Sequence, residues 1–195
     1  MSRSENRRIT DLGTLKAVAH PLRMRLYRAL FVARTATASQ LAEQVDEAVS
    51  LVSYHLRKLA EHGLIEEAPR QSTDGRERWW RTSSQGITVR DEDFRDAPEK
   101  AAVGIAFSRL VADQRADLHL RFIEERLAWP EEWRSAAISA EWMPRLTAAE
   151  LAALDGELEA VLRKYDDKAR AAEAAGDTEG REQVAVHLHA FPFRP

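Results

Sequence analysis

A group of polar side chains between residues 50 and 58 has the chemistry needed to contact a nucleic acid. It combines small hydroxyls, a phenol, an imidazole and two cations: Ser50, Ser53, Tyr54, His55, Arg57 and Lys58. Hydroxyl and ring groups on a helix hydrogen-bond to base edges in the major groove of DNA, whereas Arg and Lys neutralise phosphates. The alternative for each residue alone is an ordinary solvated side chain, or, for His55, a place at the border of the buried face.

A second set of cations follows closely. Arg76, Arg78 and Arg81 lie just after Asp74-Gly75, a pair of residues typical of a hairpin turn. Cations on such a tip neutralise phosphates and make binding depend on salt. The neighbouring Trp79-Trp80 pair is open to two interpretations: one core and one interface residue, or a pair that stacks on bases.

Periodic apolar residues predict the elements that position both sets. A helix over 9–19 and another beginning at Pro21 are followed by a helix over about 37–45, which opens on a capping box of Thr37 and Gln40. A helix over 49–62 has Val52, Leu56 and Leu59 on its inward side, and Gly63 ends it. Two strands, beginning at Leu64 and covering 77–82, complete a hairpin.

The chain contains three strings in the order HPLRMRLYRAL, SQLAEQV and SLVSYHLRKLAEHGLI, and the basic hairpin follows them. By this order the chain resembles, over about residues 10–90, the ArsR family of bacterial winged-helix transcriptional regulators. The resemblance implies a positioning helix at 37–45, a recognition helix at 49–62 and a wing at 70–78. It also implies a dimer that releases its operator when an effector binds. The chain departs from the family in having no cysteine for a thiolate metal site, and in having Asp46 and Ala48 before the recognition helix, where glycine and a capping Ser or Asn are expected.

Composition narrows the class of protein. The 44% hydrophobic and 31% charged residues fit a globular chain, and neither a membrane span nor a secretory signal is recognisable, so we expect a cytoplasmic protein. Residues 1–90 carry 15 basic against 10 acidic residues, and residues 91–195 carry 14 against 22. A basic half suits a polyanion. Phosphate loops, nucleophile elbows and metalloprotease motifs are missing from the sequence, which predicts no catalytic residue, no cofactor and no enzyme activity.

The acidic half has weaker signals. Residues 83–97 read as a linker, and a helix from Pro98 to about Leu127 has a stripe that suits a dimer interface or a monomer core: Val103, Phe107, Leu110, Gln114, Leu118 and Phe122. A strand is expected over 135–143, and alternating apolar residues predict another over 183–191. Between them, a capping box of Thr147 and Glu150 predicts a helix to about Ala175 with these residues inward: Leu151, Leu154, Leu158, Val161, Leu162 and Tyr165.

Two groups in this half are candidates for a ligand site. The first consists of aromatic side chains that line an apolar effector pocket or simply form core: Trp129, Trp133, Trp142, Phe191 and Phe193. The second is His187 with His189, which share a strand face but need a third ligand, such as His119, to hold a metal. Two histidines on a half-exposed strand are the simpler interpretation, so no metal site is predicted.

Together these patterns predict a mainly α fold with small β content (α+β). A winged helix-turn-helix domain at 10–90 is followed by a long helix and a helix–strand–helix–strand extension at 98–195 for dimerisation and effector sensing. The predicted function is a homodimeric regulator of transcription, a repressor, that inserts helix 49–62 into the major groove of double-stranded operator DNA, with wing 70–78 on the flanking groove or backbone, and is released by a small-molecule effector. The alternative is a winged-helix module for protein interaction.

Overall fold

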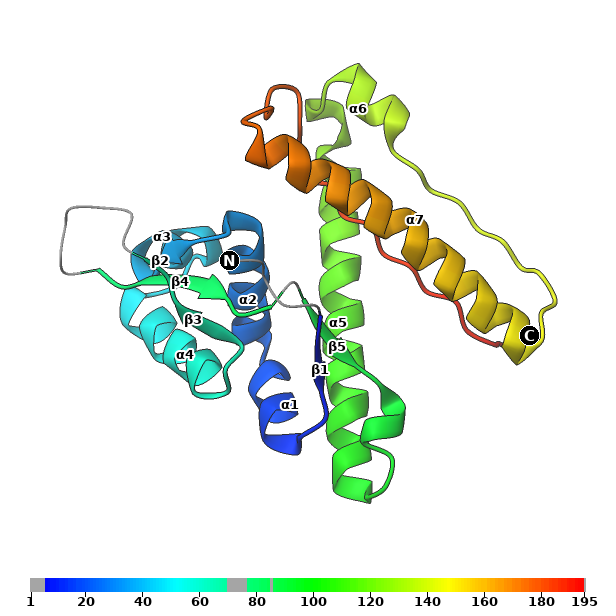
Figure 1. Ribbon diagram of the computed structural model, residues 1–195, viewed down its shortest axis with the longest axis horizontal. Helices are drawn as coiled ribbons and strands as arrows, with labels where there is room; N and C mark the ends of the chain where they lie inside the picture. The colour runs from blue at the N-terminus through cyan, green and yellow to red at the C-terminus, as the bar shows by residue number, and fades with distance from the viewer. Residues whose placement is uncertain (1–5, 70–76, 85, 195) are drawn as a thin grey trace. The chain divides into compact units, whose positions relative to one another are not determined.

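The computed structural model describes residues 6–69, 77–84 and 86–194 (Figure 1). The chain divides into two compact units, Met1–Phe122 and Ile123–Pro195, and each is described separately below. The fold is mainly helical with small β-sheets, as the sequence predicts. The functional division into 10–90 and 98–195 stays a prediction. Within the described residues, no helix is both long enough and apolar enough to cross a membrane.

Four helices, formed where apolar residues recur at helical spacing, build the base of the first unit: α1 (Leu12–Val18), α2 (Pro21–Ala33), α3 (Ala38–Val45) and α4 (Val49–Glu61). Pro21 is at the first position of α2, where its missing N–H costs nothing. The capping box before α3 is present, with Thr37 and Gln40 each hydrogen-bonded to the other's backbone N–H. These four helices confirm the predicted ones to within a few residues.

The hairpin strands are β3 (Ile65–Glu67) and β4 (Trp79–Thr82), which pair antiparallel with Ile65 opposite Thr82. The sheet has the order β2–β4–β3, and its other outer strand is β2 (Ala36–Thr37), which the sequence did not predict. Trp80 is buried and Trp79 half-buried, which favours the interpretation of one core and one interface residue. The Asp74-Gly75 turn and Arg76 lie outside the described residues.

The core of the first unit lies between the helices and the sheet. Its fully buried members include leucines and valines on the inward sides of α1, α2, α3 and α4: Leu15, Val18, Leu26, Leu30, Leu41, Val52, Leu56 and Leu59. Leu64, which precedes β3, and Ile65, the first residue of that strand, are buried in the same core. Burial of this apolar surface is the main term that stabilises the unit.

Residues 83–97 are not the linker that the sequence predicted. They contain β5 (Ile87–Val89), which pairs in parallel with β1 (Arg7–Ile9), and the 3-10 helix η1 (Asp91–Asp93). Phe94 is fully buried in the core. The prediction failed because short strands with charged and polar neighbours have no clear periodicity, and their pairing depends on a segment about 80 residues away.

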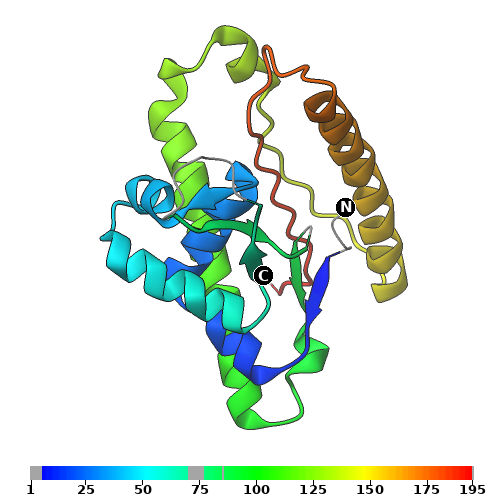
Figure 2. The ribbon, with the colours of Figure 1, turned by 60° about the vertical axis from the view of Figure 1, so that its left-hand side comes forward.

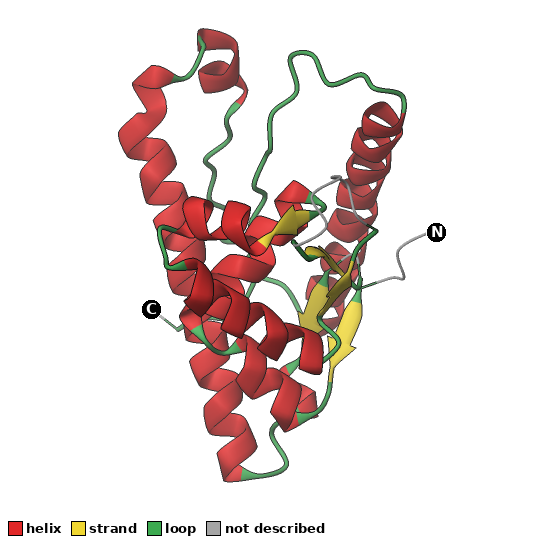
Figure 3. Cartoon of the chain, turned by 90° about the vertical axis from the view of Figure 1, so that its left-hand side faces the viewer, coloured by secondary structure: helices red, strands yellow, loops and turns green. Residues whose placement is uncertain are grey.

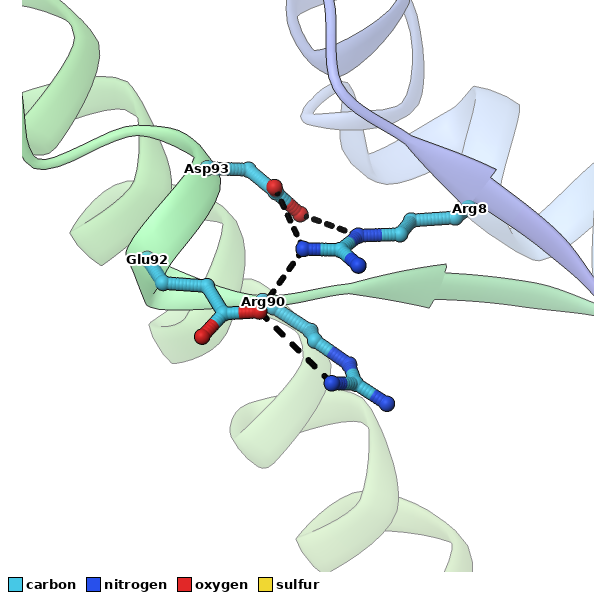
Figure 4. A network of polar contacts seen from close by, with 4 residues as sticks. All are labelled: Arg8, Arg90, Glu92 and Asp93. Atoms are coloured by element: carbon cyan, nitrogen blue, oxygen red, sulfur yellow. Dashed lines mark hydrogen bonds and ion pairs between the residues drawn. The ribbon is translucent and has the colours of Figure 1, made fainter.

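An ion-pair network fixes β1 on this segment (Figure 4). The Arg8 guanidinium donates to both carboxylate oxygens of Asp93, at 2.7 and 2.8 Å, and to Glu92 at 2.7 Å, and the Arg90 guanidinium lies 3.6 Å from the same Glu92 oxygen. Hydrogen bonding to Arg8 lowers the pKa of Asp93 below its ordinary value. The N-terminal strand is thus tied to the chain just before the next long helix.

That helix, α5 (Pro98–Glu125), confirms the predicted one, and Phe107 of its stripe is buried against the core. Val103 and Leu110 pack beside it, and the other stripe residues are half-buried. The side-chain amide of Gln114 donates to the carbonyl of Pro21 at 3.2 Å, and the backbone carbonyl of Gln114 accepts a hydrogen bond from the Arg28 guanidinium at 3.4 Å. The N-terminal part of the stripe therefore belongs to the monomer core, and a dimer contact by the helix stays a prediction.

The second unit contains η2 (Arg126–Ala128), α6 (Glu131–Ala136) and α7 (Ala148–Ala174). The capping box of Thr147 and Glu150 and the extent of α7 confirm the prediction. The predicted strands 135–143 and 183–191 are wrong: both segments are irregular, apart from the end of α6, and run extended (Figures 2 and 3). Alternating side chains specify a strand only where a neighbouring backbone supplies ladder hydrogen bonds, and the described residues provide none here.

The inward face predicted for α7 is also not buried. Leu151, Leu154 and Leu158 are half-buried, whereas Val161, Leu162 and Tyr165 are exposed. Among the described residues of this unit, Ala172 is the one buried apolar side chain, with 8% exposure. The reason is that an amphipathic stripe requires an apolar surface to cover it, and the irregular segments beside α7 supply little.

Candidate nucleic-acid interface

Helix α4 separates its apolar and polar residues onto opposite sides. Val52, Leu56 and Leu59 are fully buried against the core. Helix α4 lies at the edge of the first unit (Figures 1 and 2), and its other side carries the contact residues predicted on this helix, apart from His55. Of these, Ser50, Tyr54 and Arg57 are exposed, and Ser53 and Lys58 are half-buried: a continuous polar surface.

The turn before α4 fixes which side chains that surface contains. Asp46 has a left-handed backbone, φ 52°, and its N–H donates to the last carbonyls of α3, so a residue other than glycine supplies the turn. Ala48 is the N-cap, with extended backbone and no side-chain hydrogen bond. The helix consequently begins at Val49, in agreement with the predicted start.

His55 differs from its neighbours. Its side chain points into the protein, with 7% exposure, and its ring lies 4.6 Å, centroid to centroid, from that of His20. The ring of Tyr54 meets it edge-on at 5.1 Å. In this conformation the imidazole is not available to a ligand on the polar surface of α4.

The cations of the interface are held by carboxylates of the same chain. On the hairpin, the Nε of Arg81 donates to a carboxylate oxygen of Glu66 at 2.8 Å, a terminal nitrogen of the same guanidinium lies 2.7 Å from that oxygen, and Arg78 lies 3.2 Å from Glu67. On α4, Lys58 donates to Glu61 at 2.8 Å, and this hydrogen bond raises the pKa of the lysine.

Arg57 is different, because its guanidinium Nε donates at 3.3 Å to the carbonyl of Ser53, within the same helix. At the other end of the sheet, the Ser39 hydroxyl donates to Glu77 at 2.8 Å and joins the start of α3 to the base of the hairpin. The positions of Arg76 and of the tip of the wing lie outside the described residues.

Two features of this surface escaped the sequence prediction. Leu51 is exposed beside Ser50, where an apolar side chain suits the methyl group of thymine. Glu66 and Glu67 occupy the strand opposite the arginines of the hairpin. The alternation of charge between the two strands, acidic in 66–67 and basic in 78–81, was the signal that could have shown these pairs.

The candidate ligand residues of the second unit differ widely in how much of each side chain is exposed to solvent. Trp129 and Trp133 are half-buried, but Trp142 and Phe191 are 79% and 69% exposed. These two rings are therefore not enclosed in an apolar cavity. No group of three or more metal-ligating side chains occurs among the described residues, and His187 is half-buried.

Comparison with known proteins agrees with the geometry of the first unit. Residues 18–68 match the model of a helix-turn-helix domain, and the match runs from the end of α1 to just past β3. The chain therefore contains a helix-turn-helix domain, the class of domain that presents its second helix to DNA. No curated protein sequence matches the chain.

Several solved structures of regulators are similar in part. A possible transcriptional regulator for arsenical resistance is 29% identical, over 53% of this chain and 97% of that one, with a TM-score of 0.32. A MarR family transcription regulator is 21% identical over 83% and 81%, also with 0.32. A MarR variant from E. coli, complexed with operator DNA, is 19% identical over 76% and 83%, with 0.31.

Proposed function

We propose that this protein is a dimeric, DNA-binding regulator of transcription of the ArsR type, a repressor in the bacterial cytoplasm, without enzyme activity. In this proposal α4 enters the major groove of operator DNA, and the hairpin tip at 70–78 lies on the flanking groove or backbone. A small-molecule effector that releases the DNA completes the proposal, with the C-terminal half as the part that senses it.

The polar surface of α4 carries this proposal. Ser50, Ser53 and Tyr54 lie along the helix from its first turn, the part of a recognition helix that approaches base edges most closely. Arg57 follows on the same side, at the place where a cation meets a phosphate. Val52, Leu56 and Leu59, which face the core, hold this surface rigidly.

The second candidate is a winged-helix module that binds a protein. Two observations favour it: the chain has a net charge of −3, and Glu66 and Glu67 neutralise the arginines of the hairpin. A surface whose cations are already paired attracts phosphates less strongly than free cations do.

Titration of a duplex from the upstream region of its own gene, followed by fluorescence anisotropy at several salt concentrations, tests the proposal. We expect saturable binding that exceeds binding to a random duplex and weakens steeply with salt. Arg57→Gln should weaken binding to all sequences and reduce the slope of log K against log salt by about 1. Arg163→Gln on α7 is the control and should leave both unchanged. Equal binding to both duplexes, or none, would refute the regulator and favour the protein-binding module.

A further inference from the structure

A pair of histidines joins the recognition helix to α2. His20 is the N-cap of α2, with an extended backbone, and its side chain makes no capping hydrogen bond. His55 lies in the middle of α4. The two rings are tilted by 40°, with their centroids 4.6 Å apart. Both Nδ1 atoms are buried, and neither has a hydrogen-bond partner among the described residues.

The charged groups around this pair are mostly cationic. Arg23, one turn along α2, is half-buried and acts on both rings with its positive charge. Glu47, in the turn before α4, is the carboxylate that acts on His55, but it is shared with Arg25, whose guanidinium lies 4.0 Å away. A proton on either imidazole would therefore meet the positive charge of Arg23 with little compensation.

The other polar groups beside the pair do not supply an anion. The Tyr54 ring meets His55 edge-on. The side chain of Arg23 reaches the carbonyl of Lys16 at 3.5 Å, and the Lys16 ammonium is itself held by Glu99 of α5 at 2.7 Å. Burial lowers the pKa of both histidines, and for His55 the charges of His20 and Arg23 lower it further. Both rings are accordingly neutral in the folded protein at pH 7.

We propose that His20 and His55 form an acid-sensitive contact, which keeps the recognition helix docked on α2 while both rings are neutral and releases it when either ring binds a proton. A proton bound here places a positive charge next to Arg23, on a half-buried (His20) or buried (His55) ring whose Nδ1 atom has no hydrogen-bond partner among the described residues, and separation of α4 from α2 relieves that charge. The part of this inference that concerns DNA rests on the proposed function, whereas the acid-sensitive contact itself does not.

The sign of the effect follows from linkage. Above the ordinary histidine pKa of 6.5, a histidine whose pKa is lowered by folding is neutral in both the folded and the unfolded chain, so it does not change the free energy of unfolding. Below that value the unfolded chain binds protons that the folded chain excludes, so stability falls as the pH falls. For each histidine that stays neutral in the folded state, the unfolding constant rises about tenfold between pH 7.5 and 5.5, and about a hundredfold for both.

Urea unfolding of the full chain at pH 7.5, 6.5 and 5.5 tests the contact without DNA. We expect the wild type to lose stability over this range, and His20→Gln and His55→Gln each to lose about tenfold less in unfolding constant. His119→Gln, an exposed histidine on α5, is the control and should behave as the wild type. If His55→Gln does not fold, His20→Gln alone decides. A wild type that is equally stable at all three pH values, or an unchanged pH dependence in the glutamine variants, overturns the proposal.

Anisotropy with the same upstream duplex tests the release of the recognition helix. Falling pH normally strengthens DNA binding, because a protein gains positive charge. Here we expect the wild type to bind about threefold or more weakly at pH 6.0 than at 7.5, and His20→Gln to show a smaller weakening, because only His55 then remains to bind a proton. Tighter or unchanged wild-type binding at pH 6.0 overturns the release. Absence of binding at every pH refutes the proposed function instead, and the urea series then decides the acid-sensitive contact.

Discussion

The carboxylates of β3 should weaken the affinity of the hairpin for DNA, and their removal should strengthen it. Arg81 and Arg78 are bound to Glu66 and Glu67 at 2.7 and 3.2 Å. A phosphate that takes either arginine must displace its carboxylate, and the carboxylate also repels the phosphate. We therefore predict that Glu66→Gln and Glu67→Gln each bind DNA more tightly than the wild type.

The size of the gain follows from the exposure of the pairs. The side chains of Arg81 and Glu66 are 34% and 50% exposed, and those of Arg78 and Glu67 are 67% and 60% exposed, so water screens both pairs. An exposed ion pair of this kind contributes about 0.2–1 kcal/mol. Removal of that cost tightens binding by about 1.4- to fivefold for each substitution, with Glu66→Gln toward the upper end because its arginine is more buried and lies closer to its carboxylate.

Fluorescence anisotropy at about 0.1 M salt, where screening is moderate, measures this gain. Glu159→Gln is a matched control, since Glu159 forms an exposed ion pair with Arg163 on α7, at 2.6 Å and with similar exposure. Circular dichroism should show that all three variants keep the helical content of the wild type. Binding by Glu66→Gln that is equal to or weaker than that of the wild type would refute the reasoning, because the arginine would then need its carboxylate or would not meet DNA.

Two further predictions concern the stability of the domain. Leu56→Ala, at a fully buried position of α4, should lower the free energy of unfolding by about 2–5 kcal/mol in urea titration, since it leaves a cavity; a change below about 1 kcal/mol would show that α4 is not packed on this core. Gly63→Ala should cost about 1–2 kcal/mol, because Gly63 has φ 63° and the added methyl would lie 3.1 Å from the Arg7 guanidinium; an unchanged midpoint would contradict the left-handed turn.

Local signals were sufficient for the helix-turn-helix part of the fold. The capping boxes at Thr37 and Thr147, the proline at the start of α2 and the glycine after α4 each act within a few residues, so the sequence alone predicted where these helices begin and end. The polar face of α4 followed from the same periodicity. Strands β3 and β4 were predictable because their turn residues lie between them.

Features that depend on distant partners were not predictable. Strand β5 forms because β1, from the start of the chain, pairs with it. Phe94 is buried because it packs into a core built mainly by earlier parts of the chain. His55 lies at the border of the apolar side of α4, and the contact of its ring with His20, which comes from a distant part of the chain, does not follow from the periodicity of α4. The alternation in 183–191 is as regular as that of a strand, but it lacks a partner in the described chain.

The contact between α5 and α2 has a mechanical consequence. Gln114 donates to the carbonyl of Pro21, the residue directly after His20, and the guanidinium of Arg28, two turns further along α2, donates to the backbone carbonyl of the same glutamine. Helix α5 is continuous from Pro98 to Glu125, about 42 Å long, and Gln114 lies within it. A shift of α5 at Gln114 would therefore act directly on the backbone of Pro21, next to His20, whose ring meets that of His55 on α4.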